Sequence, residues 1–267
     1  MHEMTPETFP NDQHGMANTQ TFAAEVAGEE LLFDPTGVLI WPAESTLIVA
    51  DLHLEKGSSH AERGIFLPPY DTAATLAALS GVLARYAPKT VICLGDSFHD
   101  RRADMRISPQ DRETIAEFQT GRSWFWISGN HDPVAPAGLG GSPCDELGFG
   151  NLVFRHEPKL EPAPGEIAGH LHPCGKIRAR GRSVRRRCFA TDGSRLVLPA
   201  FGSFTGGLNV LDEAWSGIFD RRRFKACLLG ENRVYPIPAR ALLRDRKTGG
   251  FRLNTPRTAE AGRKQVG

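Results

Sequence analysis

The sequence predicts an α/β fold in which two facing mixed β-sheets form a central sandwich flanked by helices. Three observations predict it. Apolar runs alternate with helix-like segments up to about residue 150, short apolar segments joined by Gly/Pro turns follow, and no clear linker divides the chain. Alternating strands and helices are typical of a parallel or mixed sheet covered by helices, and the later segments are accommodated most simply by a second sheet facing the first.

Continuous apolar runs predict the strands of the first sheet, because buried strands are apolar on both faces. These runs are residues 46–50, 90–94 and 124–127. The second sheet is expected to use shorter extended segments. They are residues 152–154, 167–168, 196–198, 207–211, 216–219 and 226–229.

Two helices are expected between the strands of the first sheet. Residues 71–86 carry apolar side chains at near-helical spacing, with Asp71 as a possible cap and Pro88 as the stop. Ser108 and Pro109 are suited to the N-cap and first helical positions of a second helix that ends near residue 120.

The two ends of the chain are polar and lack an apolar period. We expect a disordered arm at residues 1–20, one domain at 21–247 and a disordered basic tail at 248–267. No run of about 18 apolar residues predicts a membrane span, and no secretory signal is visible at the N-terminus. The five cysteines are odd in number and form no Cys-x-x-Cys pair, which favours free thiols and a cytoplasmic protein.

The net charge of +1 conceals an uneven distribution. Residues 1–50 contain eight acids and no lysine or arginine, whereas residues 151–267 contain 23 bases and ten acids. Such asymmetry points to an anionic partner or, alternatively, to a solvated surface balanced by the acidic first part of the chain.

Four short runs of metal-ligand side chains follow predicted strands. They are Asp-Leu-His at residues 51–53, Gly-Asp-Ser-Phe-His-Asp at 95–100, Gly-Asn-His-Asp at 129–132 and Gly-His-Leu-His at 169–172. Carboxylate, amide and imidazole groups suit divalent metals, and loops at the carboxyl ends of strands converge. We expect His170 and His172 to share one face of a strand and to address two adjacent ions.

The order of these runs, with His156 between the last two, resembles the calcineurin-like metallophosphoesterase family. The resemblance implies a four-layer fold and two divalent ions, held by seven side chains. One ion would bind Asp51, His53 and His172, the other would bind Asn130, His156 and His170, and Asp96 would bridge them. His131 would bind phosphate or protonate the leaving group, and His99, in place of the commoner Asp, would lie near the scissile phosphate.

Longer matches around residues 50–56, 94–100, 169–173 and 198–207 resemble a bacterial subgroup, the ligase-associated DNA-damage-response endonucleases. That resemblance implies a Mn²⁺-dependent phosphodiesterase, with Fe, Zn or Mg as alternative metals, in which metal-activated water or hydroxide attacks DNA during repair. It also implies an ATP-dependent DNA ligase and a helicase as partners.

Seven basic residues crowd into the twelve positions 176–187, just after the last ligand run. They are Lys176, Arg178, Arg180, Arg182, Arg185, Arg186 and Arg187. Several arginines together predict sequence-independent, salt-dependent binding of a nucleic-acid backbone, although a solvated hairpin is the alternative.

Two other functions remain open from the sequence. A small-molecule phosphatase or cyclic-nucleotide phosphodiesterase would use the same ligands but would not need the basic stretch. A non-catalytic, metal-containing module of a repair complex would keep the fold without turnover, but the retention of every ligand position and of His131 argues against it.

Overall fold

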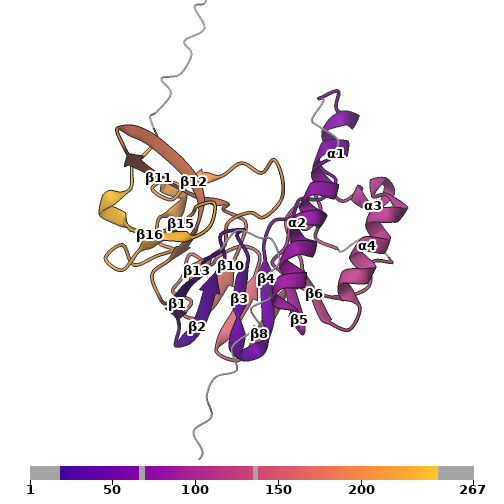
Figure 1. Cartoon of the computed structure of the whole chain (residues 1–267), viewed down its shortest axis with the longest axis horizontal. Helices are drawn as coiled ribbons and strands as arrows, with labels where there is room; N and C mark the ends of the chain where they lie inside the picture. The colour runs from indigo at the N-terminus through magenta and orange to yellow at the C-terminus, as the bar shows by residue number, and fades with distance from the viewer. Residues whose placement is uncertain (1–18, 66–69, 135–137, 246–267) are drawn as a thin grey trace, which may run out of the picture.

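A computed structural model describes residues 19–65, 70–134 and 138–245, which form two mixed β-sheets stacked face to face (Figure 1). The predicted sandwich of two facing mixed sheets flanked by helices is therefore confirmed. Most of the predicted N-terminal arm and all of the predicted C-terminal tail lie outside the described residues.

The first sheet has seven strands in sequential order, with β1 to β4 antiparallel and β4 to β7 parallel. The strands are β1 (Phe22–Val26), β2 (Glu29–Phe33), β3 (Leu39–Trp41), β4 (Thr46–Val49), β5 (Thr90–Cys93), β6 (Ser123–Ile127) and β7 (Ser142–Cys144). The three predicted strands of this sheet are confirmed as β4, β5 and β6. Their parallel pairing brings the residues that follow each of them to one edge of the sheet.

The second sheet has nine strands, with β14-β11-β12-β13-β10-β9-β8 as its main path and β15 and β16 paired beside β12. The strands are β8 (Glu146–Phe149), β9 (Leu152–Arg155), β10 (Glu166–Ala168), β11 (Pro173–Ala179), β12 (Arg182–Thr191), β13 (Leu196–Val197), β14 (Leu208–Asn209), β15 (Lys225–Leu229) and β16 (Val234–Pro238).

One predicted strand of the second sheet is wrong. Residues 216–219 form turns after the 3₁₀ helix η2 (Glu213–Trp215), and Trp215 and Ile218 pack against the outer face of the sheet. Ile218 is buried and Phe219 is half-buried, but a compact turn packs them instead of a strand. Short apolar runs do not distinguish the two.

All but the first of the α-helices of the described residues supply side chains to the cluster on the outer face of the first sheet, and the first contacts the second (Figure 1). The helices are α1 (Lys56–Glu62), α2 (Asp71–Tyr86), α3 (Ala103–Arg106) and α4 (Pro109–Gln119), and the remaining 3₁₀ turns are η1 (Pro42–Glu44) and η3 (Ala239–Ala241). Neither α2 nor any other helix within these ranges is long and apolar enough to cross a membrane.

Helices α2 and α4 confirm the two predicted helices, with one correction at a cap. The Ser108 hydroxyl accepts a hydrogen bond from the Asp111 amide at 3.0 Å, as expected of an N-cap. Asp71, by contrast, is the first residue of α2, and its carboxylate accepts a hydrogen bond from the Gly57 amide. Asp71 therefore joins α1 to α2 rather than capping α2.

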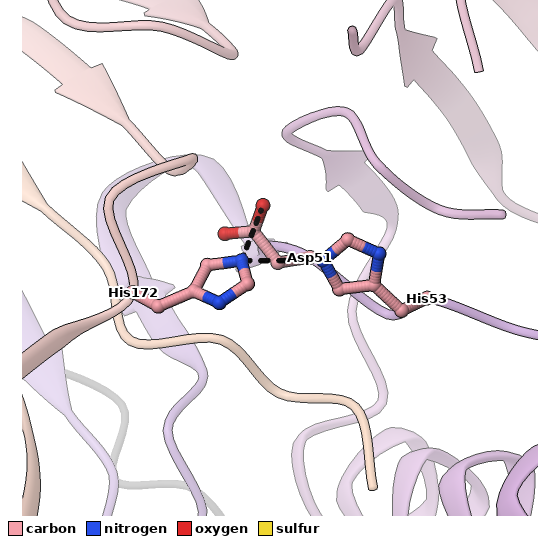
Figure 2. Close-up of side chains that lie close together, drawn as sticks. All are labelled: Asp51, His53 and His172. Atoms are coloured by element: carbon pink, nitrogen blue, oxygen red, sulfur yellow. Dashed lines mark hydrogen bonds and ion pairs between the residues drawn. The ribbon is translucent and has the colours of Figure 1, made fainter. Parts of the chain in front are cut away.

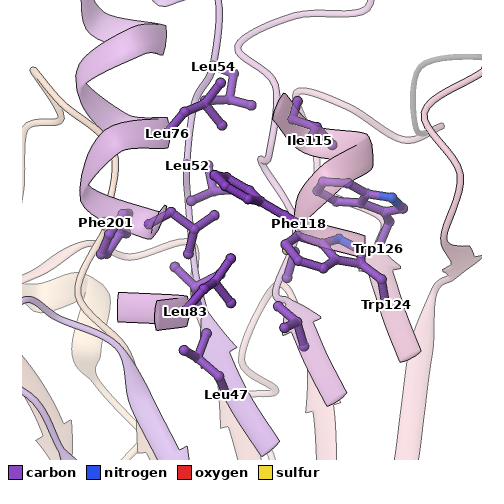
Figure 3. Packing of buried hydrophobic residues seen from close by; sticks show 14 of the residues in the cluster. Leu47, Leu52, Leu54, Leu76, Leu83, Ile115, Phe118, Trp124, Trp126 and Phe201 are labelled. Carbon is purple, nitrogen blue, oxygen red and sulfur yellow. The ribbon is translucent and has the colours of Figure 1, made fainter. Parts of the chain in front are cut away.

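The alternation of side chains in β4 shows how the layers are built. Leu47 and Val49 pack with the helices, whereas Ile48 and Ala50 pack between the two sheets. Figure 3 shows the helix-facing cluster, in which Phe118 of α4 packs near the β6 tryptophans. Because both faces of β4 are buried, its register is fixed, and so is the position of the residues that follow it.

Candidate metal centre

The predicted ligands follow five strands of the two sheets. Asp51 follows β4, Asp96 follows β5 and Asn130 follows β6, while His156 follows β9 and the last two histidines follow β10. Backbone hydrogen bonds join neighbouring loops: the His53 amide donates to the Asp96 carbonyl at 2.9 Å, and the Gly169 amide donates to the His156 carbonyl at 2.9 Å. The nine predicted ligand and catalytic residues are thus brought to one place from positions far apart in the chain.

The first group of side chains is Asp51, His53 and His172 (Figure 2). The Nε2 atoms of the two histidines are 3.2 Å apart, and His172 Nε2 is 3.4 Å from Asp51 Oδ1. Asp51 is fully buried, and its carboxylate also accepts a hydrogen bond from the His170 amide. Three donor atoms therefore converge on one point at the edge of the sandwich.

The second group is Asp96, His156 and His170, with Asn130 beside them. His156 Nε2 is 3.4 Å from Asp96 Oδ1 and 3.1 Å from His170 Nδ1. The amide oxygen of Asn130 lies 2.9 Å from His156 Nε2 and 3.0 Å from His170 Nδ1. This group thus offers four donor atoms.

Asp96 lies between the two groups. Its Oδ1 atom faces His156, while its Oδ2 atom is 3.9 Å from His53 Nε2 of the first group. The His131 amide donates to Oδ1 at 2.9 Å and holds the carboxylate in this orientation. A carboxylate with one oxygen toward each group is arranged as a bridging ligand is.

The donor separations fit divalent cations. Ligand atoms about 2.1 Å from an ion are about 3.0 Å apart at octahedral angles and about 3.4 Å apart at tetrahedral angles. The closest separations within the two groups are 2.9–3.4 Å. The residues present therefore suit the two divalent metals that this class of site binds.

The hydrogen bond of His156 fixes which of its ring nitrogens is free. Its Nδ1 atom is 2.8 Å from the carbonyl of Leu94, and a carbonyl oxygen only accepts, so Nδ1 carries the hydrogen. Once it has lost its second proton, the ring presents the lone pair of Nε2 to the second group, as a metal ligand requires.

At two glycines of the predicted motifs, another residue lies too close to leave room for a Cβ atom. A Cβ on Gly129 would lie 2.2 Å from the Asp96 amide nitrogen and 2.3 Å from Asp96 Oδ1. A Cβ on Gly95, which has a φ of +75°, would lie 2.6 Å from the ring of His156. Each glycine makes room for a ligand supplied by another run, which explains why glycine precedes the ligand in these motifs.

The backbone of the ligand residues is strained. Eleven described non-glycine residues have a positive φ, and five of them belong to the ligand set. These five are Asp51, His53, Asp96, His170 and His172. Left-handed backbone costs roughly 1–2 kcal/mol per residue and persists at functional sites where the surrounding structure imposes it.

This backbone corrects the expectation for the Gly-His-Leu-His run. His170 and His172 lie in the turn between β10 and β11, not on one face of a strand, with φ values of +68° and +44°. The turn directs the two rings into different groups. The geometry agrees with the expectation that the two histidines face two adjacent sites. The reason given for it, that side chains alternate along a strand, is wrong, because these residues are not in a strand.

His131 and His99 lie beside the two groups. Their rings are stacked, with centroids 5.4 Å apart, and the His131 Nδ1 atom donates to the His99 carbonyl at 3.0 Å. His131 Nε2 therefore remains free, 3.8 Å from Asp96 Oδ2, on a side chain that is 42% exposed. His99 is more enclosed and is 5.7 Å from the His53 ring, centroid to centroid.

Burial and neighbouring charges set the protonation of the site. Burial and the neighbouring His172 lower the pKa of His53 to about 3, and burial with the Lys56 ammonium lowers the pKa of His99 to about 4. Burial opposes ionisation of Asp96 and His156, but the hydrogen bond between them prevails. It leaves the pKa of Asp96 at about 2 and that of His156 at about 9. In the absence of metal, protonated His156 is therefore the positively charged partner of the Asp96 carboxylate.

Sequence reasoning assigned no role to two residues near the site. Burial raises the pKa of Asp132 to about 7, and its carboxylate accepts a hydrogen bond from the Phe98 amide, which holds the Gly-Asn-His-Asp loop against the preceding ligand loop. Lys56 is close enough to depress the pKa of His99. Their signal was position: Asp132 directly follows His131, and Lys56 lies three residues after His53.

The basic residues at 176–187 lie on the antiparallel hairpin of β11 and β12, but they differ in environment. Arg187 donates to the Ala200 carbonyl at 2.6 Å, and Lys176 pairs with Asp245 at 3.1 Å. Arg185, although exposed, also faces Asp245. The remaining side chains of the set are exposed. They are Arg178, Arg180, Arg182 and Arg186. At about 3.3 Å per residue, the hairpin carries its tip roughly 25 Å from His172.

Two facing sheets with clustered carboxylates, imidazoles and an amide at the strand ends define a metal-dependent phosphoesterase. A family model for calcineurin-like phosphoesterases matches residues 45–184, and the chain belongs to this family. The crystal structure of the Pseudomonas putida nuclease MPE is similar, with a TM-score of 0.63 and 31% sequence identity over 82% of this chain and 100% of that one. No curated protein matches. The family resemblance inferred from the sequence is confirmed.

Proposed function

We propose that this phosphoesterase is a dinuclear-metal phosphodiesterase that cleaves DNA. The observation that carries the proposal is the pair of donor groups joined by Asp96, next to an exposed histidine. The similarity to a nuclease and the exposed arginines of the β11–β12 hairpin support nucleic acid as the substrate. Mn²⁺ is the proposed metal, and DNA repair in the cytoplasm, beside a ligase and a helicase, is the proposed setting.

The ligands in this proposal are those predicted from the sequence. Asp51, His53 and His172 would hold one ion. Asn130, His156 and His170 would hold the second, and Asp96 would contribute to both. Two divalent ions, when bound, would lower the pKa of water and stabilise the negative charge that develops on the phosphoryl oxygens.

His131 is positioned to act on the departing oxygen. Its Nδ1–H is engaged by the His99 carbonyl, so Nε2 is the atom that meets substrate. When the ring carries hydrogen on both nitrogens, Nε2 at this exposed position donates a hydrogen bond to a phosphoryl oxygen or a proton to the leaving alkoxide. The His99 ring, stacked on His131 and neutral at pH 7, restricts its rotation and lies near the scissile phosphate.

The exposed arginines supply the first contact with a long substrate. Arg178, Arg180 and Arg182 are exposed near the end of the hairpin and have no base-reading motif near them in the sequence. Guanidinium groups bind phosphates irrespective of base, so the affinity for DNA should fall steeply with salt.

Hydrolysis of bis-p-nitrophenyl phosphate with Mn²⁺ tests the catalytic part of the proposal. We expect Asp96→Ala to lower turnover at least about 100-fold, because both metal positions lose a ligand. Asp104→Ala, an exposed aspartate of α3, is the matched control and should retain activity. Equal inactivity of the wild type and Asp96→Ala across Mn²⁺, Mg²⁺ and Zn²⁺ would refute catalysis.

Labelled DNA and RNA then test the substrate. Single-stranded, duplex, nicked and flap DNA and RNA should be compared with p-nitrophenyl phosphate and a cyclic nucleotide. Cleavage of DNA that declines between low and moderate salt is the expected result. Efficient turnover of the monoester or the cyclic nucleotide, with little effect of salt, would instead identify a small-molecule enzyme.

A further inference from the structure

The segment 201–207, which we call the 201–207 loop, borders the first metal group. Near its start the Gly202 amide donates to the Asp51 carbonyl at 3.1 Å, and just past its end the Leu208 amide donates to the His172 carbonyl at 3.0 Å. Both ends are thus hydrogen-bonded to the backbone of predicted ligands. Whatever the loop presents to solvent is held at a fixed place beside these two residues.

The loop contains two phenylalanines in opposite environments. Phe201 is 6% exposed and packs in the helix-facing core, where Figure 3 shows it beside α2. Phe204, three residues later, is 53% exposed. The buried ring of Phe201 anchors the loop, whereas packing in the core does not explain why an aromatic residue is present at Phe204.

Phe204 also has an unfavourable backbone conformation. Its φ is +56°, and it alone among the eight exposed large apolar side chains of the described residues has a positive φ. A bulky residue in the left-handed region is uncommon, and the usual residue there is glycine. With the five strained ligands so near, this is an outlier that points to function.

Two cationic side chains contact the backbone of the 201–207 loop. The Lys56 ammonium donates to the Phe204 carbonyl at 3.1 Å, and the Arg187 guanidinium donates to the Phe201 carbonyl at 3.2 Å. Phe204, Ser203, Thr205 and Arg187 are among the residues lining a depression of about 430 Å³, a size typical of small-ligand sites. An exposed aromatic side chain on a loop that cations contact suits a base with its phosphate.

We propose that Phe204 stacks on a nucleoside base next to the scissile phosphate, with Lys56 beside that phosphate, so that the site selects nucleoside diesters with an unpaired base. This specificity role rests on the proposed function. Stacking on one aromatic side chain contributes a factor of roughly 5–150 per base and tolerates any sequence. A base inside a duplex has both faces covered, so single-stranded or frayed ends are favoured.

The test compares two kinds of chromogenic diester that share the p-nitrophenolate leaving group. Thymidine p-nitrophenyl phosphate, as its 5′ and 3′ isomers, is compared with the analogue that carries a base-free tetrahydrofuran sugar. The proteins are the wild type, Phe204→Ala, Phe204→Trp and Tyr235→Ala. Tyr235 is a 44% exposed aromatic on β16 and serves as the matched control.

We expect the wild type to prefer at least one nucleoside isomer over the base-free ester by roughly tenfold in kcat/KM. Phe204→Ala should bring that ratio close to one, Phe204→Trp should keep it, and Tyr235→Ala should change neither rate. In Phe204→Trp, a thymidine oligonucleotide should also quench the tryptophan fluorescence more than its abasic counterpart does.

The outcomes separate the two proposals. If the wild type hydrolyses none of these diesters, the proposed function fails. If it hydrolyses them and Phe204→Ala keeps the base preference, or loses rate equally on both kinds of ester, the stacking role is overturned. Thermal unfolding of each variant shows whether a loss of rate comes from misfolding, and the Phe204→Trp fluorescence gives an answer even if Phe204→Ala does not fold.

Discussion

Gly129 offers a sharp test of how the metal centre is assembled, because substituting it moves a predicted ligand without removing one. In Gly129→Ala the new methyl group would lie 2.2 Å from the Asp96 amide nitrogen and 2.3 Å from Asp96 Oδ1. Ordinary contacts are about 3.5 Å, so Asp96 must retreat by about 1 Å. The clashing atoms belong to backbone and to a buried carboxylate, and neither moves freely.

The consequence for metal binding follows from coordination geometry. Ligand distances tolerate shifts of about 0.2 Å, so a movement of about 1 Å detaches the shared carboxylate. We expect a roughly 100-fold weaker affinity for both ions, at the upper end of what ligand-orienting residues contribute. Overpacking should also lower the free energy of unfolding by about 1–3 kcal/mol.

Isothermal titration with Mn²⁺ and urea unfolding in EDTA measure the two effects. Gly81→Ala is the control: a Cβ at Gly81 in α2 meets nothing within 4 Å. Alanine in a helix interior stabilises by about 0.5–1 kcal/mol relative to glycine, so the two substitutions should have opposite signs. If Gly129→Ala binds two ions with wild-type affinity and unfolds at the wild-type urea concentration, the close-approach argument is refuted.

Three further predictions concern protonation and stability. The pKa of His156 is raised to about 9, so its second proton must leave before an ion binds. Metal affinity measured by competitive titration should therefore rise about tenfold per pH unit from pH 7 to 9. An affinity that does not change with pH would contradict the role of His156 as a ligand. Arg187→Ala should lower the free energy of unfolding in urea by about 1–3 kcal/mol, because two backbone carbonyls lose their donor. Arg178→Ala, at an exposed position, should leave stability unchanged and weaken DNA binding. Equal effects of the two substitutions on stability would be inconsistent with the structure. Asp34→Ala should lower the free energy of unfolding by about 2–4 kcal/mol in the same assay, because the buried carboxylate accepts four hydrogen bonds. A loss smaller than that caused by Asp104→Ala, at an exposed aspartate, would count against this explanation.

The sequence predicted the elements that carry a strong local signal. Strands β4, β5 and β6 are apolar on both faces, and α2 has a clear helical period, so composition alone marked them. The candidate ligands were recognised because each run follows a strand end and keeps a recognisable spacing, and they remain a prediction. For these parts of the chain, local pattern and tertiary structure agree.

Other elements depend on contacts that a sequence pattern does not contain. Strand β1 is only half-buried, and α1 contains glycine and two serines, which are poor helix formers. Helix α1 is held instead by Asp71 from α2. Such tertiary stabilisation was invisible before the fold was known.

The basic stretch and the loop after Ala200 show a second limit. Charge could be counted from the sequence, but the partners could not, so Arg187 and Lys176 were grouped with arginines that face solvent. Phe204 lies inside the matched segment 198–207, yet its exposure and its positive φ emerge only from the structure.

Anomalous diffraction from crystals soaked in Mn²⁺ tests the central claim most directly. We expect two peaks about 3.5–4 Å apart, one among the Asp51 group and one among the Asn130 group, with Asp96 touching both. A single peak, or peaks that leave Asp96 or His156 without a metal contact, would contradict the assignment of a dinuclear centre to these side chains.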